Sequence, residues 1–295
     1  MYLFQRIEEM MMEYHDAKSV IAKFLLEEKE HLPQYTMDDI AHYTYTSKST
    51  LVRFAKLLGF KGWKDFNRAL IEEIKYSENK QITVDANFPF QPTDDYKKII
   101  SQVADLQIET IMDTMHLLQK EMLERAVIRL SKAKKIIIFG MRPHCYNAES
   151  VRWKFLSIGL HIHVAEEGEF GMLSRTLTHE DCAILISYSG NNVHRNPMAL
   201  VDIFKRNRVP MIAITSGGHN YLQQNIDCVF ELSAQERLYS KISNFASEQS
   251  LLFILNVIFA CYFQKDYSKN LTYKIENSKV LEEQRQATLR RVKEE

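Results

Sequence analysis

Residues 36–66, TMDDIAHYTYTSKSTLVRFAKLLGFKGWKDF, decide the fold of the N-terminal part of this chain. Thr36 is a suitable N-cap residue, and Asp38 and Asp39 put negative charge in the first turn of a helix, where the helix dipole favours it. A polar and β-branched run at residues 43–46 then breaks the helical pattern. Two helices separated by such a short break are typical of a helix-turn-helix.

The second helix of this pair shows a buried side and a polar side. Ser47 is a suitable N-cap, and Gly59 stands where a glycine commonly ends a helix. Leu51, Phe54 and Leu58 lie between them at helical spacing and form the apolar side. The start and the outer side of a second helix are where helix-turn-helix proteins contact grooves and phosphates.

The charge of this region agrees with a DNA contact. Residues 47–68 carry six basic residues and one acidic residue, a local charge of +5, although the whole chain has net charge zero. A basic region on a neutral protein suits a phosphate contact restricted to one domain. A solvated helical hairpin with basic residues on its exposed side is the alternative. The residues predicted to contact double-stranded operator DNA are Thr36, Ser47, Lys48, Ser49, Thr50, Arg53, Lys56, Lys61 and Lys64.

The same residues carry a family resemblance. The pattern S-x-x-T-x-x-R-F-x-x-x-L-G-F-x-G-[FW]-x-D-F, which begins at Ser47, resembles the N-terminal domain of the RpiR family of bacterial transcriptional regulators. The resemblance covers about residues 1–77, and LGFKGW is its specific part because helix-turn-helix proteins in general lack it. We expect Phe60, Trp63 and Phe66 to be core residues beneath the helices and not groups that stack on bases.

Length and composition fit a soluble protein of two domains. The chain has 295 residues, of which 45% are hydrophobic and 26% charged. The acidic, amphipathic N-terminus is unlike a secretory signal. The most apolar run, residues 251–263, is shorter than the ~20 residues that a membrane span needs, so we expect a buried helix or a subunit interface.

The four cysteines and ten histidines indicate neither disulfides nor a metal. The cysteines are scattered without a C-x-x-C pair, as expected of free thiols in a reducing cytoplasm. His161 and His163 share a face of an expected strand, but no third ligand has suitable spacing. We therefore expect a cytoplasmic protein without metal or cofactor.

The rest of the chain alternates short β-rich runs with helical patterns. We expect strands at 135–139, 161–164, 182–187, 211–215 and 228–232, and helices at about 145–158, 168–177, 194–207 and 243–263. This alternation predicts an α/β domain with a five-stranded parallel sheet flanked by helices, after an all-α helix-turn-helix domain. The predicted divisions are a DNA-binding domain at 1–77, a polar linker at 78–95, the α/β domain at 96–265 and a charged tail, as a solvated helix or a frayed end, at 266–295.

Ligands of open parallel sheets lie outside the carboxyl ends of the strands, which selects the loops at 140–144, 187–192 and 215–219. The runs IIIFG, LISYSGNN and AITSGG resemble the SIS (sugar isomerase) domain, which binds phosphorylated sugars, over about residues 120–265. The resemblance is best where SYSGNN aligns with the family pattern S-x-S-G-x-T. It implies Ser187 and Ser189 as phosphate ligands, with the backbones of Tyr188 and Gly190 close to the ligand.

Two loops depart from the SIS pattern. The first family loop, G-x-G-x-S, is here GMRPH at 140–144, and Asn192 replaces the family's threonine. Arg142 and His144 can compensate, because guanidinium and imidazole groups both donate to phosphate. They could instead fill a pocket that binds a different ligand or none. The candidate effector-binding residues are Gly140, Arg142, His144, Ser187, Tyr188, Ser189, Gly190 and Asn192.

The leading interpretation is a DNA-binding transcriptional regulator controlled by a phosphorylated sugar or a related anionic metabolite. We expect a homodimer or a dimer of dimers, which would present two recognition helices to two half-sites. The alternative is a sugar-phosphate isomerase, which would need a general base such as Glu166, Glu167, Glu169 or Glu236, although ordinary solvated glutamates explain them as well. A dimerisation scaffold with a dead pocket is a third possibility. An isomerase has no use for a basic recognition helix, so we expect no enzyme.

Overall fold

The computed structural model describes residues 3–29, 31–78, 84–218, 220–233 and 235–283. The chain forms two compact units, Met1–Asp85 with Pro89–Leu106 and Ala86–Phe88 with Gln107–Glu295. The long helix α6 (Tyr96–Leu117) contributes its first residues to the first unit and the remainder to the second.

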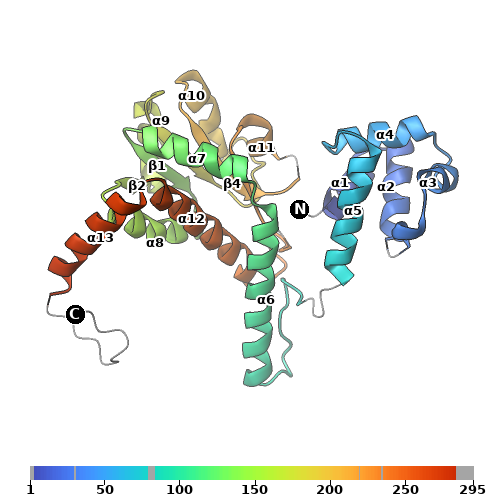
Figure 1. Cartoon of the computed structure of the whole chain (residues 1–295), viewed down its shortest axis with the longest axis horizontal. Coiled ribbons are helices and arrows are strands. Elements are labelled where there is room, and N and C mark those ends of the chain that lie inside the picture. Colours follow the sequence, from blue (N-terminus) through green and yellow to red (C-terminus); the bar gives the residue numbers. More distant parts are fainter. Residues whose placement is uncertain (1–2, 30, 79–83, 219, 234, 284–295) are drawn as a thin grey trace. The chain divides into compact units, whose positions relative to one another are not determined.

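The first unit is helical (Figure 1). Helix α1 packs against α2 and α5, and α4 packs against α2, α3 and α5. The core between them holds the fully buried side chains of Ile7, Leu25, Ile40, Leu51 and Phe54. The elements are α1 (Leu3–Glu13), α2 (Ala17–Glu27), the 3₁₀ turn η1 (Leu32–Gln34), α3 (Met37–Tyr43), α4 (Lys48–Leu57) and α5 (Trp63–Glu78).

The aromatic residues after α4 belong to this core. Phe66 is fully buried, with ring centroids 5.1 Å from Trp63, 5.5 Å from Phe60 and 5.9 Å from Phe54. Trp63 is buried as well, and Phe60 is half-buried. The prediction that these aromatics pack beneath the helices is confirmed, and they are not available for stacking on bases.

The second unit is built on a five-stranded parallel sheet in the order β2-β1-β3-β4-β5. The chain leaves the middle of the sheet in opposite directions after β1 and β3, so the point at which the strand order reverses lies between these two strands. The strands are β1 (Ile136–Gly140), β2 (Ile162–Val164), β3 (Cys182–Ile186), β4 (Met211–Ser216) and β5 (Val229–Leu232). The connecting elements are α7 (Lys120–Lys132), α8 (His144–Leu156), η2 (Glu167–Glu169), α9 (Phe170–Thr176), η3 (Met198–Leu200), α10 (Val201–Arg206), α11 (Tyr221–Asn225), α12 (Phe245–Lys265) and α13 (Tyr267–Leu281).

Helices cover both faces of this sheet. On one face, alternate strand residues such as Ile138, Ile184 and Ile212 share a core with α7, α8 and α12. The intervening residues, among them Phe139 and Leu185, join the core formed with α9 and α10. Burial on both sides explains why the strands read as continuous apolar runs. The predicted fold class is confirmed.

Helix α12 differs from the expectation that its apolar run is too short for a membrane span. It has 21 residues and is long and apolar enough to cross a bilayer by length and composition. It nevertheless packs against α8, α7 and β5, and Leu251, Ile254, Leu255 and Ile258 are buried there. Of the two predicted roles, the structure shows the buried helix.

Two short stretches also differ from the sequence expectations. The helix expected from residue 194 begins only at η3 and α10, and α11 lies between β4 and β5, where no helix was expected. The segment after residue 264 forms the helix α13, with a largely exposed surface up to residue 283. The final residues of the predicted tail lie outside the described part of the chain.

Candidate functional site

The first helix of the helix-turn-helix begins with a capping box. The Thr36 hydroxyl accepts a hydrogen bond from the backbone N–H of Asp39 at 3.2 Å and donates one to its carboxylate at 2.6 Å. The backbone N–H of Thr36 donates to the same carboxylate at 2.8 Å. Hydrogen bonds from Thr36 hold the pKa of Asp39 below its usual value. Thr36 is exposed, but its hydroxyl serves the start of α3.

The turn between α3 and α4 closes α3 with a Schellman motif. The N–H of Thr46 donates to the carbonyl of Ala41 at 2.9 Å, and the N–H of Tyr45 donates to the carbonyl of His42 at 3.1 Å. This geometry puts Tyr45 in the left-handed region, with φ of 51°. A side chain in that region costs roughly 1–2 kcal/mol. The buried Thr44 hydroxyl supports the turn by donating to the carbonyl of Ile40 at 2.6 Å.

Helix α4, the second helix of the pair, starts at the predicted N-cap. The Ser47 hydroxyl accepts from the N–H of Thr50 at 3.2 Å and lies 3.1 Å from the Ser49 hydroxyl. Leu51 and Phe54 on the other side of the helix are fully buried, which fixes how far α4 can rotate. Among the predicted contact residues of α4 and the segment after it, Lys48, Ser49, Arg53, Lys56, Lys61 and Lys64 are exposed, whereas Thr50 is half-buried.

Two of these basic groups already have neighbours within the domain. The Lys48 ammonium lies 2.6 Å from the Asp38 carboxylate, which links the start of α4 to α3. The Arg53 guanidinium donates to the Thr50 hydroxyl at 3.4 Å, a long and exposed hydrogen bond. Both interactions are exposed and therefore weak, so a phosphate can replace them at little cost.

The loop after β3 is fixed by the loop after β4. Gly190 has φ of +62°, and a Cβ there would lie 2.4 Å from the Thr215 hydroxyl oxygen and 2.6 Å from Oδ1 of Asn220. The N–H of Gly190 donates to the Ser187 hydroxyl at 3.2 Å. The Ser189 hydroxyl has no hydrogen bond to any residue that the structure describes, and Asn192 at the end of the loop is exposed. Only glycine allows this close approach, so the SYSG turn has a fixed shape.

Tyr188, after β3, and His144, after β1, both interact with Glu236 and Lys241. The Tyr188 hydroxyl donates to the carbonyl of Glu236 at 2.6 Å, and the Lys241 ammonium lies 5.2 Å from the centre of the Tyr188 ring. Burial, and secondarily the charge of Lys241, lowers the pKa of His144, whereas the charge of Glu236 opposes this shift. The buried Nδ1 of His144 has no hydrogen-bond partner among the described residues. The charges of Glu236 and Lys241 thus act on residues that follow both β1 and β3.

Glu236 is the centre of this cluster, which the sequence did not reveal. Its Oε1 accepts from the N–H groups of Ala246 and Ser247 at 2.6 and 3.0 Å, at the start of α12. Its Oε2 accepts from the Ser247 hydroxyl at 2.6 Å and lies 3.0 Å from the ammonium of Lys241. The expectation of an ordinary solvated glutamate is wrong for Glu236, because its side chain is fully buried. The nearer of the two N–H donors, Ala246, lies ten positions further along the chain, so no local pattern could reveal this contact.

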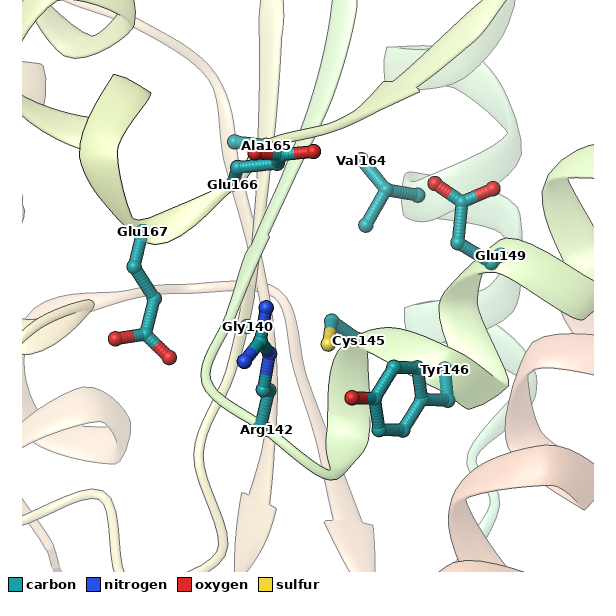
Figure 2. A pocket seen from close by; sticks show the side chains of 9 residues that line it. All are labelled: Gly140, Arg142, Cys145, Tyr146, Glu149, Val164, Ala165, Glu166 and Glu167. Atoms are coloured by element: carbon teal, nitrogen blue, oxygen red, sulfur yellow. The ribbon is translucent and has the colours of Figure 1, made fainter.

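Gly140 and Arg142 line a different space, the pocket beside the ends of β1 and β2 (Figure 2). Figure 2 shows the Arg142 guanidinium between Glu167 on one side and Cys145 and Tyr146 on the other. Three carboxylates, Glu149, Glu166 and Glu167, line the pocket beside this guanidinium, and Glu149 is paired with Arg152 at 2.6 Å, which leaves two carboxylates facing Arg142. Such an excess of negative charge disfavours a phosphate. Arg142 and His144 therefore lie beside different groups, although only one residue separates them in sequence.

The structure shows no metal site in the part of the chain that it describes. No group of three or more metal-binding side chains occurs there. His163 instead lies 3.0 Å from the carboxylate of Glu169. All four cysteines are free thiols, with Cys182 and Cys228 buried.

Comparison with known proteins agrees with these two units. Residues 1–77 match the model of the helix-turn-helix domain of the rpiR family, and residues 129–258 match that of the SIS domain. An uncharacterized HTH-type transcriptional regulator of Haemophilus influenzae is 26% identical over 266 residues, which cover 90% of this chain and 91% of that protein. The HTH-type transcriptional regulator RpiR of Escherichia coli K12 is 25% identical over 200 residues, 67% of this chain and 65% of that protein.

Solved structures share the fold at lower identity. The NanR protein of Vibrio vulnificus, solved in complex with ManNAc-6P, is 20% identical with a TM-score of 0.57, and the match covers 95% of this chain and 97% of NanR. The sugar isomerase domain of an RpiR transcription factor from Sphaerobacter thermophilus is 20% identical with a TM-score of 0.53, over 62% of this chain and 99% of that domain.

A capped, basic recognition helix joined to a SIS-type α/β domain defines a class of protein, the ligand-responsive helix-turn-helix regulators. Within that class, the two matches identify the family of each domain, and the regulators named above share this chain's sequence at 25–26% identity. Residues 1–77 belong to the rpiR family of helix-turn-helix domains, and residues 129–258 belong to the SIS domain family.

Proposed function

We propose that this chain regulates transcription by binding operator DNA through α4, under the control of a phosphorylated sugar bound by its SIS domain. The observation that carries the proposal is the exposed side of α4, where Lys48, Ser49 and Arg53 follow a helix start that is already capped and Lys56 lies in the last turn. Burial of Leu51 and Phe54 on the opposite side fixes this arrangement before DNA arrives.

The DNA contact is tested with Arg53→Ala. The probe is a labelled duplex that the full-length protein selects from a randomised pool. We expect the variant to keep its fold and to lose roughly 1–3 kcal/mol of binding free energy. A loss only on the selected duplex indicates base readout, and an equal loss on unrelated DNA indicates a phosphate contact. Unchanged affinity with native circular dichroism would remove Arg53 from the interface.

For the effector we propose that the SYSG turn after β3 holds the phosphate. The turn has a fixed shape, the Ser189 hydroxyl has no partner among the described residues, and the neighbouring cluster contains the cation Lys241 and the neutral donor His144. The pocket at Arg142 fits a phosphate less well because of its three carboxylates. Arg142 would contribute only if its side chain turned away from that pocket.

A thermal-shift screen of sugar phosphates on the full-length protein tests the effector proposal. ManNAc-6P is the first probe, because NanR of the same fold was solved with it. A ligand present at 100 times its Kd stabilises the protein by about 2.7 kcal/mol. A shift that Ser189→Ala abolishes supports the proposed site, whereas an equal shift in both proteins would put the ligand elsewhere.

We propose no catalytic activity. Several proteins of this fold are described as isomerases, among them a putative sugar-phosphate isomerase of Listeria monocytogenes with a TM-score of 0.53 and 19% identity. Isomerisation needs a base that can take a proton. Glu236 is committed to four hydrogen-bonding groups, whereas Glu166 and Glu167 are exposed at the rim of the Arg142 pocket. Turnover of any sugar phosphate that binds would overturn this proposal.

A further inference from the structure

Tyr45 is an aromatic residue that the fold does not use. It lies in the turn between α3 and α4 and its side chain is 94% exposed. Its side chain makes no hydrogen bond or ring contact with any residue of the described chain. Tyr43, two residues earlier, is different, because its ring stacks on Phe24 with centroids 5.7 Å apart.

The backbone at Tyr45 would favour glycine, as a comparison within the same domain shows. Helix α4 ends in the same Schellman motif as α3, with N–H to carbonyl hydrogen bonds from Phe60 to Ala55 and from Gly59 to Lys56. The left-handed residue is Gly59 at the end of α4, with φ of +85°, and Tyr45 at the end of α3, with φ of 51°. The left-handed backbone is therefore strained at Tyr45 and not at Gly59, and the exposed Tyr45 side chain makes no packing contact that offsets this strain.

The position of Tyr45 points to what it contacts. It precedes the N-cap of α4, Ser47, by two residues, and the exposed Lys48 and Ser49 follow in the first turn. Strained residues with solvent-exposed side chains commonly mark functional positions. Tyrosine hydroxyls are among the groups that contact DNA phosphates and set the register of a protein on the duplex.

We propose that Tyr45 is a DNA-positioning residue whose phenol hydroxyl donates a hydrogen bond to a phosphate oxygen at the edge of the operator half-site. The inference rests on the proposed function, because it requires α4 to be the recognition helix. The contact would be independent of base sequence. Because the phenol is uncharged, the contact would release no counterion from the DNA.

The test measures the affinity of full-length Tyr45→Phe and Tyr45→Gly for two labelled duplexes at four salt concentrations. One duplex is selected by the wild-type protein from a randomised pool, and the other has an unrelated sequence. Arg53→Ala provides the charged comparison. Tyr239→Phe is the matched control, because Tyr239 is 91% exposed and belongs to the other unit.

We expect Tyr45→Phe to bind both duplexes about tenfold more weakly, as the loss of a hydrogen bond to a charged group implies. The slope of log K against log salt should stay unchanged for Tyr45→Phe. If Arg53 neutralises a phosphate, the slope should become shallower for Arg53→Ala, by about 0.9 for each phosphate that the variant leaves unneutralised. Tyr45→Gly should bind as weakly as Tyr45→Phe while unfolding at no lower urea concentration than the wild type.

Wild-type affinity in both Tyr45 variants would overturn the proposal. Weak binding by Tyr45→Gly together with wild-type binding by Tyr45→Phe would overturn the hydroxyl contact in favour of the ring. A loss of affinity accompanied by a changed sedimentation coefficient would assign Tyr45 to a contact between protein chains instead. If the wild type selects no duplex and Arg53→Ala changes nothing, the proposed function fails, independently of Tyr45.

Discussion

Helix α4 and the cluster around Glu236 hold similar polar groups in opposite environments. On α4 the functional side chains are exposed, and hydrogen bonds between near neighbours, such as Ser47 and Thr50, prepare them. In the SIS domain the polar groups are buried, and their partners lie far away in sequence, as with Tyr188 and Glu236. Local capping can be read from a sequence. A buried network depends on the tertiary fold and is much more sensitive to the loss of one member.

The largest expected effect tests this difference in sensitivity. Glu236→Ala removes the acceptor for two N–H groups of α12 and leaves Lys241 without its anion. Breaking a buried pair on one side costs roughly 3–5 kcal/mol, and we expect a loss of unfolding free energy of that size in urea titrations. Glu236→Gln keeps an oxygen for the helix start and should lose less.

Glu167→Ala is the control, because this carboxylate is exposed and should change stability by less than about 0.5 kcal/mol. Equal stability of Glu236→Ala and Glu167→Ala would show that the buried network contributes nothing to the fold.

The next effect concerns the ligand and not the fold. Ser189→Ala removes the hydroxyl that has no partner among the described residues and lies on a turn fixed by Gly190. Loss of a hydrogen bond to a phosphate should weaken effector binding by about 1.5–3 kcal/mol, roughly tenfold to a hundredfold. Calorimetry with the sugar phosphate found by thermal shift measures this loss. DNA affinity without effector should stay as in the wild type, and a parallel loss of DNA binding would contradict a separate effector site.

At the exposed start of helix α4, Ser47→Ala should lower the free energy of unfolding by less than Glu236→Ala does. The substitution removes the acceptor for the N–H of Thr50 at the start of α4. Loss of a serine N-cap costs typically about 1 kcal/mol. Urea unfolding should show this loss in full-length protein, and Ser47→Asp should recover most of it because aspartate is an equally good cap. An unchanged midpoint in Ser47→Ala would mean that α4 is held by its buried side alone.

The sequence predicted the two regions to different degrees for a physical reason. Thr36, Ser47 and Gly59 act within a few residues of their own position, so caps and helix ends followed from local chemistry. The parallel sheet followed from apolar runs of strand length. Glu236 and Lys241 could not be identified, because their role depends on where α12 begins and on a tyrosine 48 residues away.

The divergence of Arg142 and His144 escaped prediction for a related reason. Both belong to the loop after β1, and the sequence placed them together against one phosphate. In the structure α8 begins at His144, whose pKa is affected by the charges of Lys241 and Glu236, whereas Arg142 lines the pocket with the three carboxylates. Their roles in effector binding remain proposals.

The smallest expected effect is the pH dependence that His144 gives to effector binding. Burial, aided by Lys241, lowers the pKa of His144 in the ligand-free protein, so the imidazole is neutral at pH 7. A phosphate bound nearby would raise that pKa, because an anion favours the charged form. Binding would then take up a proton, and affinity should increase as pH falls from 7 through the pKa of the complex towards that of the free protein. Below both values it should level off.

Stability should change with pH in the opposite direction when no ligand is present. The unfolded chain protonates His144 at its ordinary pKa, whereas the folded protein resists protonation. The contribution of His144 is therefore complete above the unfolded pKa and is lost as pH falls through the folded one. His144→Gln should flatten both profiles. Calorimetry of the wild type and of this variant at pH 5.5, 6.5 and 7.5 measures the first profile, and urea unfolding at the same pH values measures the second. Parallel profiles in the two proteins would exclude His144 as the group that couples proton uptake to the effector.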